Sequence, residues 1–166
     1  MEALINQRNI GITFDPDSKV AQARVWAPGK SSVKIEIPEK ELIIPLTLGE
    51  GGYWTLQSEK IAPGDQYRFI LNEENSLPDP ASVSQPDGVH GLSEAVDLSG
   101  YNWNDSSWKN HALADYIIYE LHTGTFTKEG TLTAIIDKLP YLQSLGITAI
   151  EIMPVAQFPG SRNWGY

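Results

Sequence analysis

A β-α-β pattern that occurs only once, between residues 115 and 153, most constrains the fold of this chain. Residues 116–122 and 148–153 are short runs rich in β-branched and aromatic residues, typical of strands buried on both faces. Between them, apolar residues recur every three or four positions over residues 132–145, which predicts an amphipathic helix. Gly146 is placed to end this helix, and Pro140 is expected to kink it.

A single unit of this kind cannot bury both faces of its own strands. Ile117, Ile118, Ile150 and Ile152 need apolar neighbours that the rest of the sequence does not supply. We therefore expect a parallel sheet that is incomplete in this chain, through truncation rather than through completion by another chain. Open strand edges also predict self-association of the isolated chain.

The first hundred residues have a different pattern, that of an antiparallel β-sandwich. Apolar and polar residues alternate over residues 33–37, 42–48 and 67–71, the period of a half-buried strand. Pro45 places the second of these runs at a sheet edge. Turns rich in Gly, Pro and Asp separate these runs from further expected strands at residues 11–14, 20–26, 53–57 and 95–98.

Periodicity stops between residues 72 and 91, where prolines restrict the backbone. We expect this segment, which we call the strap, to be docked on the sandwich rather than flexible. An aromatic cluster of Tyr101, Trp103 and Trp108 follows before the β-α-β pattern begins.

Composition excludes several classes of function. The net charge of −9, from 12 basic and 21 acidic residues, disfavours binding to nucleic acid. No apolar run is long enough to span a membrane, and the N-terminus lacks the features of a secretory signal, so a cytoplasmic protein is expected. The chain has no cysteine, and its three histidines have no metal-ligand spacing, so we expect no metal and no cofactor.

Four segments carry a resemblance to a known family. DYIIYELHTGTFT (residues 115–127) and LGITAIEIMPV (145–155) resemble the first two barrel strands of α-amylase superfamily enzymes. PDPAS followed by QPDGVHG (78–91), and FPGSRNWGY (158–166), are similar to malto-oligosyltrehalose trehalohydrolases within that superfamily. A branching enzyme would more typically have histidine-proline, and serine or threonine, before the final tryptophan-glycine-tyrosine. Pro140 is a mild departure from the helix of this family.

The resemblance implies a fold. Residues 1–99 would form an immunoglobulin-like β-sandwich of the starch-enzyme type, including the strap, and residues 100–114 a connector. Residues 115–166 would begin a (β/α)₈ (TIM) barrel that is incomplete in this chain.

It also implies a function, the release of trehalose from malto-oligosyltrehalose by cleavage of an α-1,4 bond. The aspartate nucleophile, glutamate acid/base and second aspartate of the superfamily would lie beyond Tyr166, so no catalytic residue is assigned and this chain alone is expected to be inactive. Tyr166 would stack on substrate sugar, and Trp164 would either contact sugar or support its loop. Alternatives are a glycogen branching or debranching enzyme and, in another class, a non-catalytic glucan-binding or assembly module.

For several other residues, a structural role competes with a catalytic or sugar-binding one. Glu120 and Glu151 lie on the expected barrel strands before their ends, so we expect structural rather than catalytic carboxylates. His122, at the end of the first of those strands, is expected to be a hydrogen-bonded structural residue. In the sandwich, Trp26, Tyr53 and Trp54 could form a sugar-stacking platform; we expect Trp26 to pack in the core and Trp54 to be more open.

Overall fold

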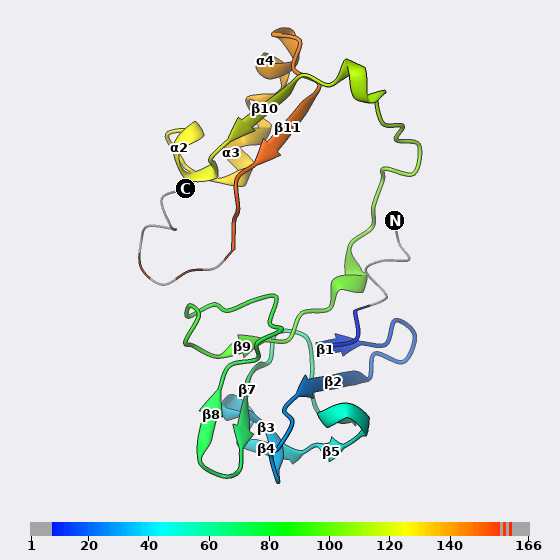
Figure 1. Cartoon of the computed structure of the whole chain (residues 1–166), viewed down its shortest axis with the longest axis vertical. Helices are drawn as coiled ribbons and strands as arrows, with labels where there is room; N and C mark the ends of the chain where they lie inside the picture. The colour runs from blue at the N-terminus through cyan, green and yellow to red at the C-terminus, as the bar shows by residue number, and fades with distance from the viewer. Residues whose placement is uncertain (1–7, 157, 159, 161–166) are drawn as a thin grey trace. The chain divides into compact units, whose positions relative to one another are not determined.

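The structure is a computed structural model that describes residues 8–156, 158 and 160. The chain divides into two compact units, Met1–Asn102 and Trp103–Tyr166, and each is described by itself (Figure 1).

The first unit contains two antiparallel sheets. One has the order β1-β2-β6-β5, with β1 (Gly11–Phe14), β2 (Ala21–Trp26), β6 (Tyr53–Ser58) and β5 (Thr47–Leu48). The other has the order β4-β3-β7-β8, with β4 (Leu42–Pro45), β3 (Val33–Ile37), β7 (Gln66–Leu71) and β8 (Asn75–Leu77), and β9 (Ser93–Glu94) also pairs with β7. Short 3₁₀ turns are η1 (Pro38–Lys40), η2 (Glu50–Gly52) and η3 (Leu98–Gly100). The predicted strand-rich organisation is confirmed.

The inner faces of these two sheets share one hydrophobic core. Alternation along β3 sends Val33, Ile35 and Ile37 inward, where all three are buried. Trp54 from the other sheet and Phe69 from β7 belong to the same buried cluster. Complete burial of a side chain of this size contributes about 1.5–3 kcal/mol, so this cluster is the main source of stability in the unit.

The run at residues 42–48 forms two strands rather than the single edge strand that its alternation predicts. β4 ends at Pro45 and pairs with β3, whereas β5 begins at Thr47 and pairs with β6 in the opposite sheet. Leu46, between them, is buried. Pro45 lacks an N–H for a continued ladder, which explains why the chain crosses between the sheets here.

The region after β7 also departs from prediction. Residues 75–77 form β8 within the expected irregular segment, after a hairpin turn in which Asn72 and Glu73 both have positive φ (53° and 62°). The strand expected at residues 95–98 is wrong, because the pairing to β7 is made earlier, by Ser93–Glu94.

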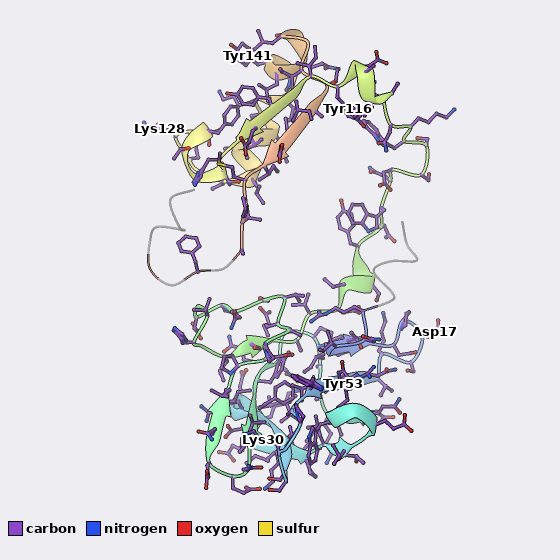
Figure 2. The ribbon with its side chains drawn as sticks, in the orientation of Figure 1. Asp17, Lys30, Tyr53, Tyr116, Lys128 and Tyr141 are labelled. Atoms are coloured by element: carbon purple, nitrogen blue, oxygen red, sulfur yellow. The ribbon has the colours of Figure 1, made fainter. Side chains whose placement is uncertain are left out.

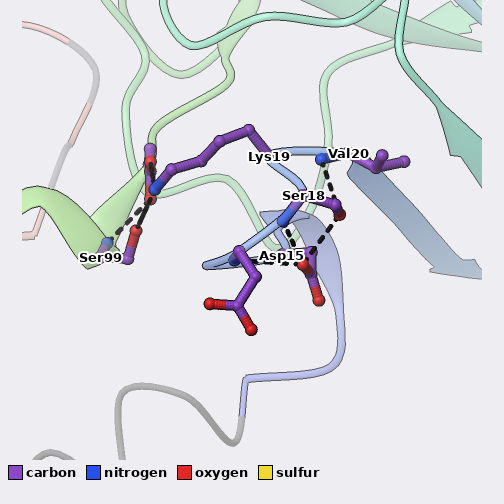
Figure 3. A network of polar contacts seen from close by, with 7 residues as sticks. Asp15, Ser18, Lys19, Val20 and Ser99 are labelled. Carbon is purple, nitrogen blue, oxygen red and sulfur yellow. Dashed lines mark hydrogen bonds and ion pairs between the residues drawn. The ribbon is translucent and has the colours of Figure 1, made fainter.

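Polar contacts connect the β1–β2 turn to the chain that follows β9 (Figure 3). The carboxylate of Asp15 accepts hydrogen bonds from the backbone N–H and the hydroxyl of Ser18, both at 2.8 Å. The ammonium of Lys19 lies 3.3 Å from the carboxylate of Asp97 and 3.2 Å from the hydroxyl of Ser99. The turn therefore holds residues 97–99 beside the sandwich.

The second unit contains one β-α-β arrangement. Its elements are η4 (Leu113–Asp115), β10 (Ile118–Leu121), α2 (Thr123–Phe126), α3 (Leu132–Ile136), α4 (Leu139–Ser144) and β11 (Ala149–Ile152). β10 and β11 pair in parallel, with Ile118 opposite Ala149 and Leu121 opposite Ile152. The expected helix is broken into α3 and α4, and Pro140 lies in the first turn of α4, where its missing N–H is tolerated. Gly146 follows α4 with φ of 86°, as predicted for a helix stop.

Candidate functional site

The first candidate site is the sheet edge at the carboxyl ends of β10 and β11, which we call the candidate edge. Because the two strands are parallel, Leu121 and Ile152 end them side by side, and the Met153 backbone N–H donates to the Leu121 carbonyl at 2.9 Å. The segments that follow are α2 and the residues after Met153. In sheets of parallel strands, ligands generally bind outside this edge, on the following loops.

Glu120 and Glu151 lie just before that edge. They are direct partners across the strand pair, so both carboxylates leave the same face of the sheet, and both are exposed. Neither forms an ion pair within the described ranges 8–156, 158 and 160. Each glutamate lies one residue before its strand ends, and their structural rather than catalytic role stays a prediction.

His122 caps the helix that leaves β10. Its Nδ1 accepts a hydrogen bond from the backbone N–H of Gly124 at 3.0 Å. A side chain on Gly124 would begin 3.1 Å from the imidazole Cε1, so glycine gives the ring room to lie over the first helical turn. With Nδ1 as acceptor, the proton of the neutral ring is on Nε2. This histidine organises the loop at the candidate edge.

The predicted sugar-binding residues Trp164 and Tyr166 lie outside the described residues, as do Arg162 and Asn163. Within the described part of the chain, no group of three or more His, Cys, Asp or Glu side chains could hold a metal ion. His111 instead makes an edge-to-face contact with Tyr116, with 6.2 Å between ring centroids.

The sandwich aromatics take the opposite positions from those predicted. Trp54 is buried, with 6% of its surface exposed, and its indole N–H donates to the Ala27 carbonyl at 3.1 Å. Trp26 is 56% exposed, and its N–H donates to the Gly51 carbonyl at 3.0 Å. The signal was present in β2, where Ala23 and Val25 are the inward residues, so that Trp26 must point outward.

A groove of about 870 Å³ covers the outer face of the β1-β2-β6-β5 sheet. Arg24 lies over the ring of Tyr53, which is labelled in Figure 2, with its guanidinium carbon 4.1 Å from the ring centroid. This is a cation–π contact that fixes both side chains. The charged Arg8 and Glu50 also line the groove, together with six side chains that carry hydroxyls or amides, namely Thr13, Thr47, Thr55, Asn9, Gln22 and Gln57. The groove is therefore polar, with a small aromatic component.

A buried polar cluster fixes the strap, and sequence reasoning missed it. The carboxylate of Asp79, which is 3% exposed, accepts a hydrogen bond from the Tyr67 hydroxyl at 2.6 Å and another from the Ala81 backbone N–H at 2.8 Å. The Asp79 N–H donates to the Ser93 hydroxyl at 2.9 Å. Burial raises the pKa of the Tyr67 phenol, and the nearby carboxylate raises it further. This cluster joins Asp79, within the strap, and Ser93, on β9 just after it, to Tyr67 on β7.

The chain is similar in sequence to malto-oligosyltrehalose trehalohydrolases along nearly its whole length, so the predicted resemblance is confirmed. It is 44% identical over 156 residues to the enzyme from Saccharolobus solfataricus and 41% identical over 157 residues to that from Deinococcus radiodurans. These alignments cover 94% and 95% of this chain and 26% of each relative. The chain thus spans about a quarter of the length of the curated relatives it matches. No family model matches it.

Solved structures agree with this similarity. A Salmonella typhimurium protein assigned as an alpha amylase is 41% identical, with a TM-score of 0.85 over 96% of this chain and 27% of its own. A pullulanase from Anoxybacillus sp. LM18-11, solved with maltotriose, is 26% identical, with a TM-score of 0.70 over 95% of this chain and 27% of its own. In the described residues, no helix is both long and apolar enough to cross a membrane.

Proposed function

We propose that this chain is part of a glycoside hydrolase that acts on α-1,4-glucans and releases trehalose from malto-oligosyltrehalose. The observation that carries the proposal is the 44% identity to a malto-oligosyltrehalose trehalohydrolase over 156 residues. A 1,4-alpha-glucan branching enzyme from Pseudoalteromonas atlantica is only 27% identical, over 142 residues. The difference favours trehalohydrolase over branching specificity.

The proposed fold of this part has two domains. Residues 1–99 form an immunoglobulin-like sandwich, residues 100–114 a connector, and residues 115–166 the first β-α-β unit of a (β/α)₈ barrel. Parallel pairing of β10 with β11 supports the barrel assignment, as does the exposure of Ile118 and Ile150 on their faces. In a complete barrel, neighbouring strands and helices would cover those faces.

The proposed reaction is hydrolysis of the α-1,4 bond next to a terminal trehalose unit. Two carboxyl groups perform such chemistry in retaining glycosidases: one attacks the anomeric carbon, and the other protonates the leaving oxygen and then activates water. We assign neither group to this chain. Its proposed contribution is the candidate edge of β10 and β11, with Tyr166 stacking on a sugar ring and Trp164 either contacting sugar or supporting its loop.

The test uses a longer protein that contains this sequence, supplied with malto-oligosyltrehalose, amylose and pullulan in parallel. Trehalose release without new branches or pullulan cleavage supports the proposal. Formation of α-1,6 branches from amylose would replace it with the branching alternative. The 166-residue chain, assayed beside it, is expected to give no product above background.

Tyr166 can be tested in the same protein with two variants. Tyr166→Ala removes the ring and is expected to lower kcat/KM on the order of tenfold or more, whereas Tyr166→Phe keeps the stacking face and loses less. Equal activity of Tyr166→Ala and the parent would contradict a substrate-binding role.

The 166-residue chain itself is expected to self-associate through its second unit. The two strands β10 and β11 pair only with each other among the described residues, so each leaves one edge without a neighbouring strand. Apolar residues on both strands remain exposed beside these edges. Sedimentation velocity over a hundredfold range of concentration should show species larger than the monomer, and a strictly monomeric chain would contradict this expectation.

A further inference from the structure

We propose that His122 is a pH-sensitive positioning residue, which holds the loop of residues 123–130 in place while its imidazole is neutral and releases this loop when the imidazole is protonated. The loop begins with α2 and leaves the candidate edge directly after β10 (Figure 1). Loops at this edge are the ones that bind ligands in barrels of parallel strands. The reaction that the loop serves rests on the proposed function, whereas the contacts that fix the loop do not.

One histidine accepts three successive hydrogen bonds at the start of this loop. The backbone N–H of Gly124 donates to Nδ1 of His122 at 3.0 Å. The next two backbone N–H groups, of Thr125 and Phe126, donate to the carbonyl of the same histidine at 3.1 and 3.0 Å. α2 has only four residues, and a helix this short is not stable without contacts from outside it. Loss of the Nδ1 bond therefore loosens the first turn of the loop.

The rest of the loop packs against this first turn. A Cβ added at Gly130, which has φ of 63°, would lie 3.1 Å from the Gly124 carbonyl oxygen, so the end of the loop returns onto its start. Thr127 is buried, and its hydroxyl accepts a hydrogen bond from the Gly130 N–H at 3.1 Å. The Phe126 ring makes an edge-to-face contact with Tyr119 of β10, with 5.8 Å between ring centroids. The position of the whole loop therefore depends on its capped first turn.

The bond from Gly124 to the histidine exists in only one protonation state of the ring. Nδ1 accepts the bond through a lone pair, which the protonated imidazolium lacks. Histidine is the side chain whose charge changes nearest to neutral pH, so mild acid removes the acceptor. Asparagine is preferred at helix starts of this kind and accepts the same bond without titrating. A histidine at this position therefore makes the loop sensitive to pH.

The elements next to the histidine carry four other titratable side chains. Two are on the strands and two are in the loop, namely Glu120, Glu151, Lys128, which is labelled in Figure 2, and Glu129. α3, which packs against α2, has no titratable side chain. Within residues 8–156, 158 and 160, none of the four groups forms an ion pair with His122. The Nδ1 bond is therefore the polar contact that protonation of the ring removes.

The experiment compares variants of the longer protein that contains this sequence, on whichever of malto-oligosyltrehalose, amylose and pullulan the parent cleaves. His122→Ala removes the acceptor, whereas His122→Asn keeps an acceptor that does not titrate. At neutral pH, we expect kcat/KM to fall roughly tenfold in the alanine variant and less than about threefold in the asparagine variant. Between pH 7 and pH 5, the parent should lose a larger share of its activity than the asparagine variant.

Exchange mass spectrometry of the same proteins measures the loop itself, independently of the reaction. At pH 7, the amides of residues 123–130 should exchange on the order of tenfold faster in His122→Ala than in the parent, and at nearly the parent's rate in His122→Asn. At pH 5, the parent should exchange faster in this loop than the asparagine variant, because its imidazolium no longer accepts the Gly124 bond.

His111→Asn is the matched control. His111 is an exposed histidine of the same unit, and its ring contacts Tyr116 rather than a backbone N–H of the loop. Its replacement should leave kcat/KM, the pH response and the exchange of residues 123–130 at the parent's values. Thermal unfolding of each variant checks that the fold is retained.

Exchange in the loop of His122→Ala at the parent's rate would overturn the proposal, as would a pH response that the asparagine variant shares in full. His122→Gln adds a further check, because its longer amide reaches the position of Nε2 rather than that of Nδ1. Activity restored by glutamine but not by asparagine would mean that the ring acts through Nε2, which also overturns a positioning role. Failure of the longer protein to release trehalose would instead remove the proposed reaction, and the exchange data then decide the role of His122 on their own.

Discussion

In the first unit, β3 buries Val33, Ile35 and Ile37 almost completely, whereas in the second unit β10 leaves Ile118 and Tyr119 exposed. Both strands contain several apolar residues, isoleucine among them, and both pair with a neighbour. The difference is the layer that covers them. β3 faces a second sheet, while in the described part of the second unit β10 and β11 are accompanied only by the short helices α2, α3 and α4.

The comparison shows that an apolar sequence pattern does not by itself ensure that the strand is buried. Among the described residues, fifteen buried apolar side chains belong to the sandwich core, and three more, Leu121, Ile135 and Leu142, belong to the second unit. An apolar run specifies a strand, but it stabilises the fold only where another layer removes it from water. The second unit should therefore be much less stable than the first.

Hydrogen exchange should show the largest difference between the two units. At low protein concentration, we expect the amides of residues 33–37 to exchange on the order of a thousandfold more slowly than those of 118–121 and 149–152. Exchange mass spectrometry of the whole chain measures both regions together. Equal protection of the two regions would contradict the comparison, and protection of β10 and β11 that grows with concentration would indicate self-association.

The next largest difference is expected in the stability cost of matched isoleucine substitutions in the two units. Ile35 is 0% exposed and Ile118 is 58% exposed. Ile35→Ala should lower the free energy of unfolding of the sandwich by about 2–5 kcal/mol, because it leaves a cavity in a closed core. Ile118→Ala should change stability by no more than about 0.5 kcal/mol. Urea unfolding followed by tryptophan fluorescence gives both values. A similar cost at both positions would mean that the second unit has a core of its own.

The strap should depend on the Tyr67 hydroxyl. Tyr67→Phe removes a donor from the buried Asp79 carboxylate and should destabilise the sandwich by about 1–3 kcal/mol, with faster exchange at residues 79–94. Tyr141→Phe is the control, since Tyr141 is exposed on α4. If both variants unfold at the same urea concentration as the parent, the Asp79 cluster does not hold the strap.

Lowering the pH should have the smallest effect on stability, and this effect should be confined to the sandwich. The Ser99 hydroxyl beside Asp97 holds the pKa of that carboxyl below its ordinary value of 3.8, with smaller effects in the same direction from the Ser99 N–H and Lys19. A lowered pKa means that the contribution to stability is present above pH 3.8 and is lost as the pH falls through the folded-state value. Asp97→Asn should therefore reduce the difference in urea midpoint between pH 6 and pH 3.

The acid experiment has an internal reference. Asp17→Asn changes an exposed carboxylate in the same turn. Among the described residues, Asp17 takes part in hydrogen bonding through its backbone N–H, which donates to Asp15 and is kept in the variant. It should leave the pH dependence intact. A variant at Asp97 with the parent's full loss of stability at pH 3 would assign the acid sensitivity to other groups.

Much of the local structure could be predicted from periodicity and turn chemistry. The alternation around Ile35 and Phe69 predicts β3 and β7, and the three- and four-residue spacing around Leu142, interrupted by Pro140, predicts a broken helix. The outward position of Trp26 also follows from alternation, once Ala23 and Val25 are recognised as the inward residues. These features depend on neighbours close in sequence.

For the candidate sites, the sequence indicated individual residues but not which of them lie in contact. Nothing in the local pattern indicates that the Asp79 carboxylate meets Tyr67, or that Gln22 faces Gln57, because these pairs are far apart in the chain. The split of residues 42–48 between two sheets was missed for the same reason. Strand partners are chosen by long-range packing, which is not visible in a single run.

The sequence by itself determined most of the strands, the broken helix, and the resemblance to enzymes of α-glucan metabolism. Tertiary structure alone decided that β4 and β5 belong to opposite sheets, that the strap is fixed through a buried carboxylate, and that Arg24, Tyr53 and Trp26 meet on one surface. The physical reason is distance. Backbone sterics and side-chain periodicity act over a few residues, whereas burial and polar pairing depend on segments that only the folded chain brings together.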